Sequence, residues 1–148
     1  MGKSKASRVL AFYALFLIAG LYVVGVVSHE VLRHFIQTAP VWLTVILGWR
    51  DSQWSKWTAV PCFLCWLLLM SLIWLFLLGW VHVISGAFSP LEVAMTFVVG
   101  VSAILGLAAA TRMRGRTNAM ASALVCILTL AVQLLALRVS FLPGIAHD

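Results

Sequence analysis

Charged residues are scarce in this chain, and acidic residues are scarcer still. Only 9% of the 148 residues are charged, and Asp and Glu together number 4. Soluble domains carry about 25% charged residues, whereas 64% of this chain is hydrophobic. A water-soluble fold would have to bury nearly all of these residues, and a chain of this length has too little interior for that. The composition therefore excludes a soluble domain and indicates a membrane protein.

Four long stretches lack Asp, Glu, Lys and Arg altogether: residues 9–29, 57–91, 93–111 and 117–137. Each approaches or exceeds the roughly 20 helical residues that cross a hydrocarbon core of about 30 Å. Backbone that spans a membrane must satisfy its own hydrogen bonds, which leaves helices or barrel strands. Barrel strands alternate polar and apolar residues, and runs such as 67–70 show no alternation. The spans are therefore predicted to be helices.

We predict an all-α integral membrane protein in which residues 1–148 form a single transmembrane helical domain. Four secure helices are expected over about 9–28, 59–84, 90–110 and 118–139. Ser89 would cap the third of these, with Pro90 in the first turn and Glu92 completing a capping box.

A fifth segment, residues 31–49, is shorter and contains Pro40. Its 19 residues would cover about 28 Å as a helix, which just suffices for a span. Proline is also tolerated better in membrane helices than in soluble ones. A crossing here requires a tight reversal near residues 28–30, where the chain has neither Gly nor Pro. The alternatives are a re-entrant or an interfacial helix.

The distribution of Lys and Arg distinguishes these topologies, because cytoplasmic loops are enriched in both. If residues 31–49 cross the membrane, only Arg33 and Arg138 lie on the side away from the N-terminus. The other cations then share the N-terminal side: Lys3, Lys5, Arg8, Arg50, Lys56, Arg112, Arg114 and Arg116. A four-span protein with the same N-terminal orientation would instead place most of these Lys and Arg residues outside. We therefore favour five segments in a multi-pass protein of a bacterial inner membrane, with the N-terminus in the cytoplasm.

Histidine and glutamate cluster in the run His29-Glu30-x-x-x-His34. Imidazole and carboxylate are metal ligands, although the zinc-protease pattern His-Glu-x-x-His is one residue shorter. Five spans would place His29, His34 and His82 on the same outer side, where they are candidate ligands of a metal or haem. The alternative is a polar helix end at the headgroup layer, in which Glu30 and His34 pair along one helix face.

Cysteine occurs three times, and two of the residues form the motif Cys62-Phe63-Leu64-Cys65 at the predicted start of a membrane helix. In this motif and in chain size, the sequence resembles the bacterial quinone-linked disulfide-forming membrane proteins of the DsbB type. The resemblance implies a thiol oxidoreductase with Cys62 and Cys65 as its redox pair. That family also needs a second cysteine pair in an outer loop, whereas Cys126 lies within the last predicted helix. The alternative is a pair of small side chains packed between helices.

Small residues recur every four positions at Ser102, Gly106 and Ala110, and again at Ala119 and Ala123. Such faces let helices approach closely, either within a chain or against a partner. The first set is therefore a candidate helix-packing face.

The loops are too short for a soluble catalytic module, and no polar set recurs across several spans as a transport pathway would. We expect a non-catalytic accessory or assembly subunit that acts through helix–helix contacts. Its partners would be the lipid bilayer and other membrane proteins or a second copy, and not nucleic acid, because the cations lie beside the spans. A metal- or haem-binding redox protein and a DsbB-like thiol oxidoreductase are the alternatives. The sequence identifies no cofactor.

Overall fold

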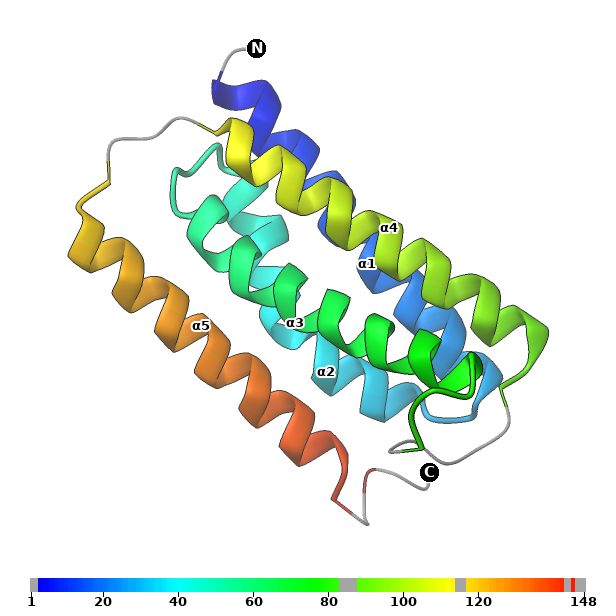
Figure 1. Cartoon of the computed structure of the whole chain (residues 1–148). Coiled ribbons are helices and arrows are strands. Elements are labelled where there is room, and N and C mark those ends of the chain that lie inside the picture. Colours follow the sequence, from blue (N-terminus) through cyan, green and yellow to red (C-terminus); the bar gives the residue numbers. More distant parts are fainter. Residues whose placement is uncertain (1–2, 83–87, 114–116, 143–144, 146–148) are drawn as a thin grey trace.

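The computed structural model describes residues 3–82, 88–113, 117–142 and 145, and these contain helices but no strand. Within these residues lie five long helices: α1 (Lys3–Val27), α2 (Val31–Trp49), α3 (Ser55–Leu77), α4 (Pro90–Arg112) and α5 (Ala119–Ser140). They run up and down in one bundle (Figure 1). All five are long and apolar enough to cross a membrane. The predicted all-helical bundle is confirmed, and its five long apolar helices are compatible with a multi-pass membrane protein.

The uncertain segment 31–49 is α2, a continuous helix despite Pro40 in its interior. Its mean hydropathy of 1.2 is the lowest of the five, because its buried face carries polar residues such as Gln37 and Thr44. α2 packs against α1, α3 and α5. It is therefore part of the bundle rather than a short helix at its edge.

Three helices end in the same type of reversal, in which a residue with positive φ turns the chain back. These residues are His29 (φ 57), Asp51 (φ 52) and Gly79 (φ 75). After α1, the Glu30 N–H donates to the Gly25 carbonyl at 2.8 Å, and after α3 the Trp80 N–H donates to the Leu75 carbonyl at 2.9 Å. His29 thus provides the tight turn between α1 and α2 without a glycine.

The boundaries of α3 differ from the predicted range of about 59–84. The helix begins earlier, at Ser55, because polar residues ahead of the apolar run are already helical. It ends earlier, at Leu77, because Gly79 adopts a left-handed conformation that stops the helix. The predicted end, residue 84, lies outside the described residues. α1 likewise begins before its apolar run, at Lys3.

The start of α4 agrees with its sequence signature. The Ser89 N–H donates to a Glu92 carboxylate oxygen at 2.6 Å, and the Glu92 N–H donates to the Ser89 hydroxyl at 3.2 Å. Pro90 occupies the first helical position, where its missing N–H costs nothing. The predicted capping box is confirmed.

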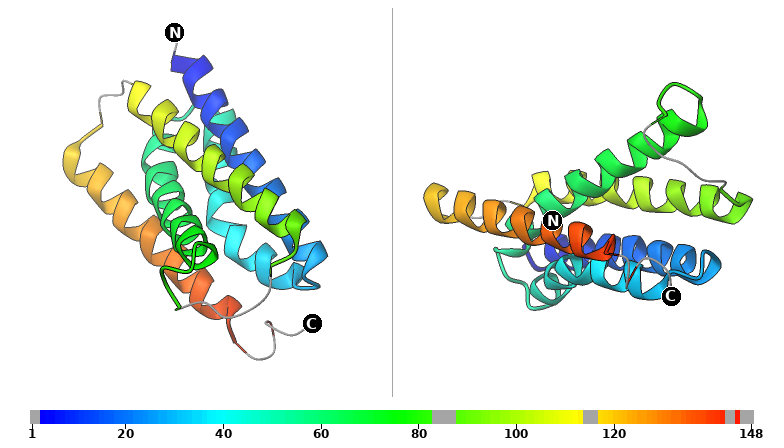
Figure 2. Two further views of the ribbon diagram at one scale, coloured as in Figure 1. Left: turned by 45° about the vertical axis from the view of Figure 1, so that its right-hand side comes forward. Right: turned by 90° about the horizontal axis from the view of Figure 1, so that it is seen from below.

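The core of the bundle is apolar, with Leu10, Leu17 and Phe63 fully buried, but α5 turns polar side chains inward and large apolar ones outward. The buried residues of α5 are all polar: Ser122, Thr129, Gln133 and Ser140. Its leucines at 124, 128 and 135 are exposed. In the described part of the chain α5 packs only against α2 and α3, on one flank of the bundle (Figure 2). This distribution on α5 fits a surrounding of lipid, which offers no hydrogen-bond partner to an outward-facing polar group.

Candidate functional site

The three candidate metal ligands lie at the end of the bundle away from the N-terminus, but they do not form a ligand set. His29 is exposed in the α1–α2 turn, His82 is exposed beyond α3, and His34 is buried in α2. Among the residues that the structure describes, no group of three or more His, Cys, Asp and Glu side chains is arranged to hold a metal ion. The metal and haem interpretation therefore gains no support from the geometry.

His34 contacts main chain instead. Its Nδ1 lies 2.9 Å from the Glu30 carbonyl oxygen, one helical turn earlier. The ring packs against Gly25 of α1, where a Cβ would come within 3.1 Å of Nδ1. The predicted side-chain pair of Glu30 with His34 is replaced by another pair, because the Glu30 carboxylate accepts a hydrogen bond from Arg33 at 2.6 Å. His34 thus fixes the first turn of α2 against α1.

The Cys62–Cys65 motif is not at a helix start, because α3 begins at Ser55 and Cys62 follows about two turns later. Both thiols are free. Cys62 is fully buried in the core, whereas Cys65 is half-buried beside α5. The helix N-terminus that activates the first cysteine of redox CxxC motifs is therefore missing here.

Cys126 has a structural partner that the sequence analysis did not predict. Its thiol donates to the Trp57 carbonyl oxygen at 3.3 Å, joining α5 to α3. In an uninterrupted helix that carbonyl would accept from the residue four positions later, which is Pro61 and has no N–H. The thiol therefore satisfies a backbone acceptor that the proline leaves free. A proline within an apolar span is the signal that could have predicted a donor from a neighbouring helix.

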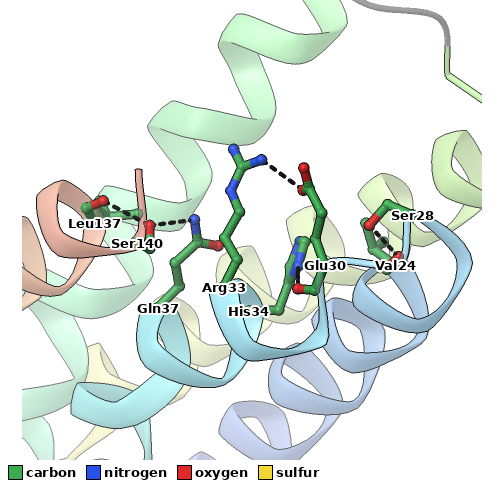
Figure 3. A network of polar contacts seen from close by, with 8 residues as sticks. All are labelled: Val24, Ser28, Glu30, Arg33, His34, Gln37, Leu137 and Ser140. Carbon is green, nitrogen blue, oxygen red and sulfur yellow. Dashed lines mark hydrogen bonds and ion pairs between the residues drawn. The ribbon is translucent and has the colours of Figure 1, made fainter. Parts of the chain in front are cut away.

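A second polar junction joins α2 to α5 near the opposite end (Figure 3). The Gln37 side-chain amide donates to the Ser140 hydroxyl at 2.9 Å, and the Gln133 amide donates to the Gln37 carbonyl at 3.0 Å. The buried Gln133 amide thus has its partner on another helix. Its Oε1 is buried and has no hydrogen-bond partner among the described residues. The Arg33 guanidinium also lies 4.3 Å from the Phe141 ring centroid, so three separate contacts fasten the end of α5.

The predicted helix-packing face is used inside the chain. Ser102, Gly106 and Ala110 are all buried on α4. A Cβ on Gly106 would overlap the Phe63 ring of α3, and one on Gly100 would overlap the Trp74 ring. Small residues here allow α3 and α4 to approach closely. Ala119 and Ala123 of α5, in contrast, remain exposed.

The polar contacts described above thus join the helices of the bundle to one another. Comparisons of the chain with protein families, with curated proteins and with solved structures find no match.

Proposed function

We propose that this chain is a small non-catalytic membrane subunit that acts through helix–helix contact with another membrane protein or a second copy of itself. The observation that carries the proposal is the poor coverage of α5 by its own bundle. Only 17% of an apolar 18-residue stretch of α5 is buried, against 33–44% for the equivalent stretches of the other four helices. A helix that its own chain covers so little has most of its surface available to a partner.

The exposed surface of α5 is suited to packing rather than to chemistry. Leu124, Leu128 and Leu135 form one stripe at helical spacing, and Leu128 is 56% exposed. The polar side chains at 122, 129, 133 and 140 are turned inward and buried. Association of such faces in lipid depends on van der Waals complementarity, because lipid tails are as apolar as leucine.

We also infer that the N-terminal end of the bundle faces the cytoplasm of a bacterial cell, across its inner membrane. Charge supports this orientation. Arg8 lies 3.2 Å from Asp51, and Lys56 donates to the Met113 carbonyl at 3.3 Å. These contacts bring the cation-bearing segments of α1, the α2–α3 turn and the end of α4 to one end of the bundle, as the positive-inside rule favours.

Photo-crosslinking in native membranes tests the proposed contact. A photoreactive amino acid replaces Leu128 on α5 or, as a control, Val101 on α4, which is 50% exposed. We expect a discrete protein adduct from position 128 and none from position 101. An adduct of twice the monomer mass would identify self-association, and a different mass would identify another subunit. Lipid adducts alone at position 128 would contradict the proposal.

A further inference from the structure

An apolar groove of about 380 Å³ lies between α3 and α5. Its walls include three residues of each helix: Val60, Leu64 and Leu68, and Ile127, Leu130 and Leu134. Leu64 and Leu68 are 52% and 63% exposed, so the groove opens sideways, toward the lipid if the helices span a membrane. It follows the two helices for about 12 Å, since eight residues rise by that length.

Cationic residues lie beyond one end of this groove. Cys126, which lines the groove, contacts the Trp57 carbonyl at 3.3 Å. The Lys56 ammonium lies 4.9 Å from the Trp57 ring centroid and 3.3 Å from the Met113 carbonyl oxygen. Arg112, next to Met113, is exposed. The groove therefore leads from an apolar interior to a tryptophan and two cations, the order of groups that a bilayer presents from its core to its headgroup layer.

We propose that this groove binds one acyl chain of an anionic phospholipid, whose headgroup phosphate lies at Lys56 and Arg112. Apolar walls provide no polar atom for a polar ligand, whereas an acyl chain needs none. Lys and Arg at the membrane surface favour anionic over zwitterionic headgroups. This inference concerns the α3–α5 groove and does not depend on the partner proposed for the outer stripe of α5.

The size of the groove favours a lipid chain over a helix of another protein. A helix with side chains is about 10 Å wide and would occupy on the order of 1,000 Å³ along a 12 Å groove. The 380 Å³ available, spread over that length, corresponds to a channel only about 6 Å across. A single flexible hydrocarbon chain fits within such a groove, whereas a helix could enter it only along one flank.

Native mass spectrometry of the purified full chain tests the headgroup part of the proposal. The protein is offered phosphatidylglycerol and phosphatidylcholine of matched chains in equal amounts. We expect the wild type to retain phosphatidylglycerol preferentially and Lys56→Gln to lower that preference about fivefold. Arg138→Gln, at the opposite end of α5, is the matched control and should leave the preference unchanged. An excess of inorganic phosphate should not displace the lipid, because the acyl chain supplies most of the contact.

Filling the groove tests the acyl-chain part. Leu64→Trp, or Leu68→Trp if the first variant fails to fold, should abolish retention of both lipids, whereas Val101→Trp on α4 should not. Equal retention of the two lipids by the wild type would overturn the headgroup assignment. If Leu64→Trp dissociates a dimer and leaves lipid retention unchanged, the groove holds a second copy and the proposal is wrong.

Discussion

At the scale of single residues, side chains that could bind a metal or react contact backbone carbonyls instead. His34 contacts the Glu30 carbonyl, and Cys126 donates to the Trp57 carbonyl. His29 adopts a φ of 57 in the turn between two helices. Histidine is among the residues enriched in the left-handed region, although the conformation is unfavourable for any side chain with a Cβ. Its identity at position 29 is explained by the turn, without a ligand.

This explanation predicts that His29→Gly stabilises the protein by about 1 kcal/mol, because glycine adopts positive φ without steric cost. Gly79→Ala is the matched control. A Cβ at Gly79 would meet nothing within 4 Å, so its expected loss of about 1 kcal/mol reports backbone conformation alone. Thermal unfolding in one detergent measures both. A lower midpoint for His29→Gly would show that the imidazole itself is needed.

At the scale of helices, α5 is held by hydrogen bonds to the two helices that contain a proline in their interior, α2 and α3. Cys126 reaches the carbonyl that Pro61 leaves free in α3. Gln133 reaches the Gln37 carbonyl, three residues before Pro40 in α2. Because water cannot satisfy backbone groups inside a membrane, a neighbouring helix has to do so. Cys126 of α5 therefore completes the backbone hydrogen bonding of the proline-interrupted helix α3, whereas Gln133 adds a separate contact to α2.

Substitutions at Cys126 and Pro61 test this coupling. Cys126→Ala should destabilise the fold by about 1 kcal/mol, because it leaves the Trp57 carbonyl without a donor. In a Pro61→Ala background the cost should fall, because the restored N–H of residue 61 donates to the same carbonyl. Cys126→Ser, which keeps a donor, should cost less than Cys126→Ala. The double-mutant cycle is measured by thermal unfolding, and additive effects would refute the coupling.

Helix positions were predictable to different degrees. α4 and α5 end within two residues of their predicted ends, and α2 matches its segment. The ends of α3 were not predictable from hydropathy, because they depend on the backbone conformation of Gly79 and on polar residues such as Ser55 that extend the helix. The partner of Cys126 was not predictable either, because apolar spans do not indicate which helices are neighbours. Of the sequence patterns, only the distribution of Lys and Arg indicated how segments far apart in the chain are arranged.

At the scale of the whole molecule, the up-and-down order of five helices brings the basic segments to one end and the α1–α2 turn to the other (Figure 1). Whether α2 crosses the membrane decides this arrangement. Without a crossing by α2, His29 and Arg50 would lie on the same side. With it they flank a helix of 19 residues at opposite ends.

Labelling with a membrane-impermeant maleimide tests this topology. His29 and Arg50 are both exposed, so a cysteine at either position is accessible to the reagent. We expect His29→Cys to react in intact cells and Arg50→Cys to react only after permeabilisation, with the wild-type chain as the background control for its three native cysteines. Reaction of both positions from one side would exclude a crossing by α2, and a reversed pattern would invert the orientation.

The hydrogen bond from Cys126 has a consequence for biosynthesis. During translation α5 emerges after α3, so the helix that contains Pro61 is made before its donor from α5. Until Cys126 arrives, the Trp57 carbonyl lacks the bond that it makes in the finished bundle. Docking of α5 is then the step that completes the backbone hydrogen bonding of α3.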